Sequence, residues 1–292
     1  MNQTQQRLKK ISYIIVSIYF VIGLLDLISF RDSMGAKFSL LDALFVKVLN
    51  VQKERTYTEP FGLYRESKHF EKPKGLHILG TDINGNDVLL QTLKGAKTAL
   101  LLAIGVNLIA IPIGIVLGVI AGYFGGWIDD IIQWFYTTVA SIPWLLFVIT
   151  FLMIFGRGMI WIIIAIGLTS WVELARIARG ETLKLREMNF IKSSLIVGKS
   201  HFRILWEEIL PNLSSIVKIT FALSSSHIIV AETVLTFIGI GIEPGSSSWG
   251  IMIAEAPREL LRDPPIWWNF FSASFLGILP LILALNILAE ER

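Results

Sequence analysis

Residues that could do chemistry are few and scattered in this 292-residue sequence. The chain has no cysteine, which excludes disulfides, thiolate metal sites and cysteine nucleophiles. Its histidines are far apart along the chain and form no His-Glu-x-x-His motif, so a metal site is not expected. They are His69, His77, His201 and His227. The sequence therefore predicts no catalytic residue, and no metal or cofactor bound by this chain.

The tripeptide Gly198-Lys199-Ser200 resembles the end of a phosphate-binding loop. Such a loop needs a glycine five positions before its Gly-Lys pair, so that backbone amides can wrap a phosphate. Ser193 occupies that position, and no strand pattern precedes it. We therefore do not expect this chain to bind a nucleotide.

The composition indicates a membrane protein. Hydrophobic residues make up 53% and charged residues 17%, with a mean hydropathy of +0.63. A soluble chain carries roughly 25% charged residues, so the polar surface is too small and most of the chain must face lipid. The net charge of +3 is too small to indicate nucleic acid as a partner.

Six segments have the roughly 20 apolar residues that a membrane-spanning helix needs. They are residues 11–30, 99–123, 128–156, 159–178, 214–240 and 266–289. A cleaved signal peptide is the alternative for the first; its long apolar run and the lack of small residues near Phe30 disfavour it. The sequence thus predicts an all-α integral membrane protein with six transmembrane helices.

Lysine and arginine set the expected sidedness, because they favour cytoplasmic loops. They gather in residues 1–10 and in the connection after the fourth span. Four spans separate these two segments, so both can face the cytoplasm, together with the two termini. Residues 31–97, the outer segment, are then external. This segment ends in turn formers at 80–87, and the apolar spacing after Val88 predicts an amphipathic helix lying on the membrane before span two.

A helix-turn-helix is expected at residues 181–212. Apolar residues around Phe190 suggest a short helix, Gly198 provides a turn where a side chain would obstruct the chain, and Pro211 ends a second helix. Apolar residues in this number must be shielded from water. Either a partner protein or the chain's own helix ends can provide this shielding.

This segment resembles the cytoplasmic loop of ABC importer permeases. The family pattern is Glu-Ala-Ala, three residues, Gly, and Leu-Pro twelve positions on; here Lys192-Ser193-Ser194 replaces Glu-Ala-Ala, while Gly198 and Leu210-Pro211 fit. Other stretches are similar to the peptide/nickel-type branch. They are Leu79-Gly80-Thr81-Asp82, Gly122 to Gly126 with Asp129, Ile166 to Trp171, Arg176-x-x-Arg179-Gly180, and Glu232 to Trp249-Gly250 with Pro244.

The resemblance implies a type I ABC importer permease fold in a bacterial or archaeal inner membrane. Implied partners are membrane lipid, a paralogous permease, two ATPase subunits that hold ATP and Mg, and an extracytoplasmic solute-binding protein. The long outer segment indicates the second of the two paralogues. The implied ATPase-coupling residues are Phe190, Ile191, Lys192, Ser193, Ser194, Gly198, Lys199, Phe202, Arg203, Leu210 and Pro211. Peptide is the expected cargo, with nickel chelates, opines and oligosaccharides as alternatives.

Polar groups inside spans are candidates for the translocation pathway or gate, since burying them in lipid is costly. They are Glu232, His227 and Ser226; the alternative for the serines is hydrogen bonding between helices. Gly114, Gly118 and Gly122 predict close helix packing, against a helix of this chain or of the partner permease. Asp26 and Lys218 lie near span ends and receive no role. The tryptophans are expected at the membrane interfaces.

Rival functions come from other classes. A secondary transporter would use several buried carboxylates and inverted repeats, but only Glu232 lies deep in a span. An intramembrane hydrolase would need a nucleophile–base or metal-ligand pair, and none is apparent. A scaffold subunit would not need the loop centred on Gly198.

Overall fold

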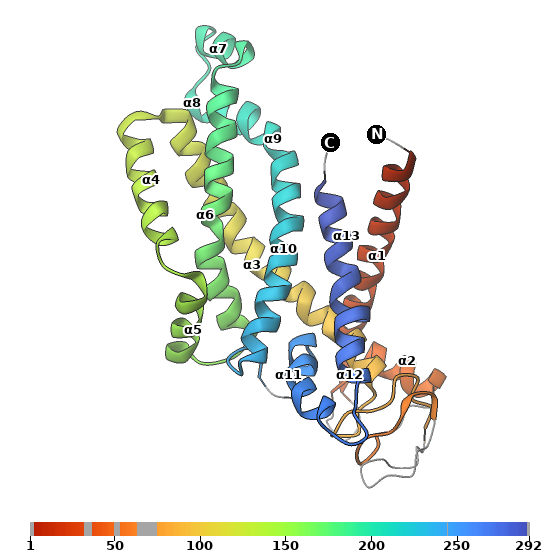
Figure 1. Cartoon of the computed structure of the whole chain (residues 1–292). Helices are drawn as coiled ribbons and strands as arrows, with labels where there is room; N and C mark the ends of the chain where they lie inside the picture. The colour runs from red at the N-terminus through yellow and green to blue at the C-terminus, as the bar shows by residue number, and fades with distance from the viewer. Residues whose placement is uncertain (1–2, 32–36, 50–52, 63–74, 244, 291–292) are drawn as a thin grey trace. The chain divides into compact units, whose positions relative to one another are not determined.

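The computed structural model describes residues 3–31, 37–49, 53–62, 75–243 and 245–290. It forms two compact units (Figure 1). The first unit comprises residues 1–102 and 229–288, and the second comprises residues 103–228 and 289–292. Parts of the outer segment, and Pro244, lie outside the described residues.

The first unit combines both ends of the membrane part with the outer segment. A short hairpin pairs Ser29 with Ser39 and Phe30 with Phe38. The elements of the first unit are α1 (Gln3–Leu27), β1 (Ser29–Arg31), β2 (Lys37–Ser39), α2 (Leu40–Leu49), the 3₁₀ turn Pro60–Gly62, the start of α3 (Val88–Phe124), the end of α10 (Ser214–Phe237), α11 (Trp249–Leu260), α12 (Trp268–Phe271), the π-helix Ser272–Ile278 and α13 (Leu279–Ala289).

The described residues of the second unit form helices joined by short turns. It holds the rest of α3 and α10 and seven further elements between them. They are α4 (Gly126–Ala140), α5 (Trp144–Phe155), α6 (Met159–Arg186), α7 (Asn189–Ile196), α8 (His201–Ile204), the π-helix Leu205–Ile209 and α9 (Leu210–Asn212). The helix-turn-helix loop, residues 187–213, is the connection between α6 and α10.

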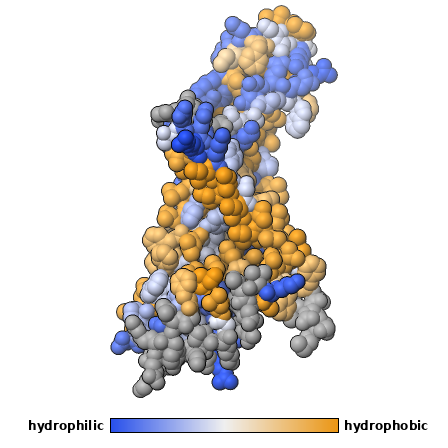
Figure 2. Space-filling model, turned by 90° about the vertical axis from the view of Figure 1, so that its right-hand side faces the viewer, coloured by the Kyte–Doolittle hydropathy of each residue, from blue (hydrophilic) through white to orange (hydrophobic). Residues whose placement is uncertain are grey.

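Five helices are individually long and apolar enough to cross a membrane, and a sixth span is reached when the bent pair α4–α5 counts as one. The segment 128–156, expected as one span, is divided into α4 and α5, which meet at 74°. Pro143 lies at the break and lacks an N–H, and it disfavours helical geometry at the residue before it. On the face in Figure 2, apolar residues cover much of the spanning helices.

The helix boundaries differ from the sequence expectation in two further places. Residues 88–97 do not form a separate surface helix but are the first turns of α3, whose only proline, Pro112, lies well beyond them. Asp87 starts that helix by accepting the Leu90 N–H at 2.8 Å. The fourth span continues as α6 to Arg186, so the residues 181–186 assigned to the coupling loop are helical.

Trp249 forms the centre of the first unit. Its indole lies where side chains on Gly95 of α3 and Gly277 would otherwise sit, since a Cβ there would come within 2.4 and 2.6 Å of Nε1. The same Nε1 donates to the Thr92 carbonyl at 2.7 Å. Trp249 and Trp268 are both buried within the first unit.

The second unit is organised by close contact between α3 and α6. A Cβ on Gly114, Gly118 or Gly122 would lie 2.5–2.8 Å from backbone carbonyls of α6. The predicted packing role of these three glycines is met by a helix of this same chain. Because the two backbones approach so closely, α3 and α6 form a firm base beneath the helix-turn-helix loop.

Candidate functional site

The helix-turn-helix loop turns at Gly198. Helix α7 ends at Ile196, Gly198 adopts φ +81°, and Ser200 caps α8 by accepting the Arg203 N–H. A Cβ on Gly198 would meet nothing within 4 Å. The sequence argument, in which a side chain would obstruct this turn, is therefore wrong in its cause: the left-handed backbone, rather than crowding, favours glycine here.

A buried row of apolar side chains anchors the loop to the second unit. Ile191, Ile204 and Ile209 are fully buried and pack with Val119 and Tyr123 of α3. Leu210 is partly buried against the same cluster. The π-helix ends at Ile209, Pro211 is the second residue of the short helix α9, and α10 begins at Ser214. A proline fits in this first turn because its missing N–H is not needed there.

Other apolar residues of the loop point outward. Ile196 and Val197 are each 86% exposed, Phe202 is 76% exposed and Trp206 is 65% exposed. The rings of Phe202 and Trp206 are stacked with centroids 6.5 Å apart. Figure 2 shows this end of the second unit as a mixture of apolar and hydrophilic surface. We call Ile196, Val197, Phe202 and Trp206 the apolar tip.

The basic residues of the loop are paired within the chain. Lys192 lies 3.0 Å from Glu187, and Arg203 lies 3.6 Å from Glu207. Lys199 lies 2.6 Å from Glu208, and this pairing lowers the pKa of the Glu208 carboxyl. Ser193 donates its hydroxyl to the Asn189 carbonyl, and Phe190 is partly exposed. The exposed surface of the loop therefore combines apolar side chains with charged groups that are already paired within the chain.

Two family-like motifs meet at the base of the loop. Arg179 of α6 donates Nε and Nη2 to the two carboxylate oxygens of Asp129 at 2.5 Å each. A bidentate pair fixes both distance and orientation, so it ties α4 to α6. The sequence carried both residues in separate motifs, but spacing alone could not join side chains 50 positions apart.

Glu232 is a buried hub near the end of α10. Its Oε1 accepts the Thr236 hydroxyl at 2.8 Å and the Ser248 hydroxyl at 3.0 Å. Thr236 in turn accepts the Ile242 N–H, and Ser248 caps α11 by accepting the Ile251 N–H. This carboxylate thus organises the turn between α10 and α11.

The serine run of α10 bonds within the second unit. Ser224 donates to Asn107 Oδ1 at 2.6 Å, and Asn107 donates to Ser225 at 3.2 Å. Ser226 donates to its own helix, at the Ala222 carbonyl. His227 is exposed. The interhelical alternative therefore describes Ser224 and Ser225, and Asn107 is a polar span residue that sequence reasoning missed.

The outer segment contains a second set of polar residues that sequence reasoning missed. His77 is fully buried, with Nδ1 2.8 Å from Asp87 Oδ2 and Nε2 3.3 Å from Glu54 Oε1. Burial opposes charging of the imidazole, but the two carboxylates outweigh it and raise the pKa of His77. The Thr81 hydroxyl donates to the Thr56 carbonyl at 2.8 Å. The motif Leu79-Gly80-Thr81-Asp82, which carried part of the family resemblance, thus contributes to the hydrogen bonds around His77.

Charged residues near span ends are also paired. Lys97 of α3 lies 3.0 Å from Asp26 of α1, and that carboxylate is buried. The expectation that Asp26 reaches the membrane surface without a role is therefore wrong, because it links two helices of the first unit.

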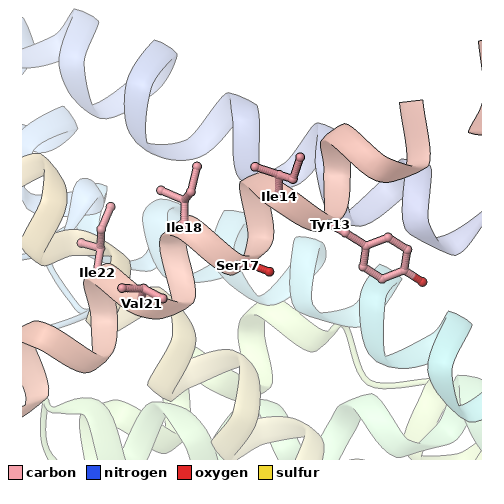
Figure 3. Close-up of a pocket in the computed structure, with 6 residues that line it drawn as sticks. All are labelled: Tyr13, Ile14, Ser17, Ile18, Val21 and Ile22. Carbon is pink, nitrogen blue, oxygen red and sulfur yellow. The ribbon is translucent and has the colours of Figure 1, made fainter. Parts of the chain in front are cut away.

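A hollow of about 410 Å³ lies along α1 (Figure 3). Its lining comes from this helix alone and is apolar except for the Ser17 and Tyr13 hydroxyls. No convergent polar groups line it, as a small-molecule site would need. We assign this face to membrane lipid.

Comparison with known proteins fits this arrangement of an apolar helical core and a protruding loop. The family described as "Binding-protein-dependent transport system inner membrane component" matches residues 114–290, which include the helix-turn-helix loop and Glu232. The chain belongs to this family. It is a multi-pass inner-membrane permease component of a transport system.

Three relatives of this permease are named as permease proteins of oligopeptide, dipeptide or glutathione transport systems. The oligopeptide transport system permease protein OppC of Haemophilus influenzae is 34% identical over 203 residues, 70% of this chain and 65% of that protein. The dipeptide transport system permease protein DppC of Bacillus subtilis is 33% identical, over 80% of this chain and 73% of that protein. The glutathione transport system permease protein GsiD of Pectobacterium atrosepticum is 32% identical, over 75% and 72% respectively.

Proposed function

We propose that this permease forms half of the translocation pathway of an ATP-driven ABC importer for peptides. Its partners are a paralogous permease, two ATPase subunits on the cytoplasmic side and an extracytoplasmic solute-binding protein. Peptide is the cargo because oligopeptide and dipeptide permeases are among its relatives. ATP and Mg are held by the ATPases, and this chain catalyses no reaction of its own.

One observation carries the proposal: the apolar tip stands on a firmly anchored loop. Side chains such as Ile196 and Val197, each 86% exposed, remain uncovered although the loop buries Ile191 completely. An exposed apolar cluster on a rigid support is typical of a protein docking site. In this role α7 and the Gly198 turn sit in a groove of one ATPase.

Coupling follows from that contact. Closure of the two ATPases on ATP draws the two docked loops together and moves the spans between inward-open and outward-open states. Shifting such an equilibrium from 1:99 to 99:1 takes about 5.5 kcal/mol of differential binding. The Asp129–Arg179 pair and the glycine contacts of α3 with α6 make the loop and the helices move as one body.

The pathway assignment concerns Glu232, Ser226 and His227. In this assignment Glu232 lies in the wall of the pathway, and its carboxylate fixes the turn before α11 through Ser248. His227 is exposed on α10. Replacing Glu232 by Gln keeps the two hydroxyl contacts, so uptake that survives this change but fails with Leu would limit Glu232 to a positioning role.

The decisive experiment is to purify the assembled complex and measure ATP hydrolysis and peptide uptake with a loaded binding protein. Gly198→Val should abolish both, because a β-branched residue disfavours φ +81°. Gly198→Asn is the matched control, since Asn tolerates that conformation. Uptake without any ATPase subunit would overturn the proposal and favour a secondary transporter.

A further inference from the structure

Three stretches of the helix-turn-helix loop meet at one carboxylate oxygen. Glu208, in the π-helix, accepts the Ser194 hydroxyl of α7 at 2.7 Å and the Lys199 ammonium at 2.6 Å, both on Oε1. Lys199 also reaches Glu207 Oε2 at 2.9 Å. We call Ser194, Lys199 and Glu208 the clamp.

The clamp lies at the bend between α7 and α8. Gly198 has φ +81° and open space around it, so no side chain packs on the turn itself. The backbone N–H groups of Gly198 and Lys199 donate to the Leu195 and Ser194 carbonyls at 3.0 Å, and the clamp adds side-chain contacts across the same turn. The clamp joins a residue four positions before Gly198, the residue directly after it and a residue ten positions after it. It therefore crosses the turn and closes it.

The contacts are partly shielded from water. The Lys199 side chain is 23% exposed and that of Glu208 is 15% exposed. Charge-assisted hydrogen bonds in such a setting are stronger than those between fully exposed ions. By contrast, the Lys192–Glu187 and Arg203–Glu207 pairs are more exposed and do not connect the two sides of Gly198.

We propose that Lys199 and Glu208 are positioning residues that set the angle between α7 and the following helices, so that the apolar tip forms one docking face. Ile196 and Val197 come from the α7 side of Gly198, whereas Phe202 and Trp206 come from the other side. Loss of the clamp should let the angle between these two sides of the turn vary. This inference rests on the proposed coupling role of the loop, but the clamp itself can be tested without it.

The first test is amide hydrogen exchange in the purified full chain. Lys199→Met should speed exchange in residues 189–198, where the clamp holds α7. Lys184→Met is the matched control, because Lys184 also lies 2.6 Å from its partner, Glu181, but both belong to α6. Equal exchange in the two variants would overturn the clamp, whatever the protein transports.

The second test is a charge exchange in the assembled complex. Lys199→Met and Glu208→Gln should each reduce peptide uptake per ATP hydrolysed by about tenfold, the size expected for one charge-assisted hydrogen bond. Lys199→Arg, and the double variant Lys199→Glu with Glu208→Lys, should recover most of it. A merely electrostatic contact with the ATPase would not be restored by the exchange, and a double variant no better than the single ones would overturn the positioning role.

The outcomes separate this inference from the proposed function. If the wild-type complex shows no ATP-dependent uptake, the proposed function is wrong, and the exchange experiment alone judges the clamp. If the wild type transports and Lys199→Met matches Lys184→Met in both tests, the clamp is wrong and the proposed function stands.

Discussion

The outer segment and the helix-turn-helix loop use polar and apolar side chains in opposite ways. In the outer segment, His77, Thr58 and Thr81 are completely buried and bonded to neighbours within the chain. In the loop, ion pairs lie at or near the surface while Ile196 and Val197 stand exposed. The outer segment buries charged side chains, whereas the helix-turn-helix loop exposes apolar ones.

The difference indicates which region depends on a partner. The hydrogen-bonding groups of buried His77 are satisfied within the chain, because both ring nitrogens face carboxylate oxygens. This histidine therefore needs no further protein to pair it, and the outer segment also contacts Trp268 and Arg262 of the same unit. An uncovered apolar tip lowers its free energy only when something covers it. We thus expect changes in the outer segment to affect folding and changes at the tip to affect assembly.

The largest effect is expected from His77→Ala. It leaves Glu54 and Asp87 facing one another in a buried space, and removing one partner of buried charges costs about 3–5 kcal/mol. Faster proteolysis and hydrogen exchange in residues 53–62 and 75–88 would report it. Asn84→Ala, at an exposed position, is the control and should leave both rates unchanged. A variant as resistant as the wild type would contradict the stabilising role of this buried pairing.

Next in size is Ile196→Asp at the apolar tip. A charge at the centre of a docking face should cost about 2–4 kcal/mol of binding, as at other interface hot spots. Co-purification of the ATPase should fail, while the melting temperature of the permease stays constant because the side chain is 86% exposed. Leu261→Asp is matched in exposure, at 88%, and lies outside the loop. Retention of the ATPase by Ile196→Asp would remove the contrast between the two regions.

A smaller effect is expected from Gly118→Ala, which probes the base of the loop. Its Cβ would lie 2.5 Å from the Ala175 carbonyl, and overpacking typically costs about 1–3 kcal/mol. Gly180→Ala on α6 is the control, since nothing lies within 4 Å of its Cβ and alanine favours a helix. Thermal unfolding in detergent should show a lower midpoint for Gly118→Ala only. Equal midpoints would mean that the helices separate easily.

Spacing and composition predicted much of this molecule. Apolar runs placed the spans, and small residues at four-residue steps located the contact between α3 and α6. The turn at Gly198 followed from the residue type, although its cause is backbone geometry rather than crowding. Pro143 was visible within span three, but the 74° bend depends on how α4 and α5 pack, which no local pattern states.

Contacts between distant positions could not be predicted. The pairs Asp26–Lys97, Asp129–Arg179 and Lys199–Glu208 join residues whose separation in sequence carries no signal. For Lys199, the family resemblance implied a role in coupling to the ATPase, whereas the structure pairs it within the loop. A single sequence shows which charges exist but not which of them are already neutralised.

The smallest expected effect is a dependence of the outer region on pH. Burial, opposed by the Asn269 contact and aided by Glu255, raises the pKa of Glu259 to about 7. The folded state therefore holds a proton that the unfolded state releases near its ordinary value, so this contribution to stability weakens as pH rises through about 7. The raised pKa of His77 acts in the same direction, because its charged form is lost as pH rises.

The side-chain contacts of Glu259 with Asn269 and Tyr57 favour its ionised form, whereas the charges of Glu255 and Asp82 disfavour it. Protection of residues 53–62 and 75–88 against hydrogen exchange, corrected for the intrinsic pH dependence of amide exchange, should thus be greater at pH 5.5 than at pH 8 in the wild type. Glu259→Gln should flatten part of this dependence and leave the part due to His77, because a neutral amide cannot titrate. The helix-turn-helix loop, measured in the same samples, should show no matching change, since the lowered pKa of Glu208 keeps the clamp ionised across this range. A Glu259→Gln profile identical to that of the wild type would assign the whole dependence to His77.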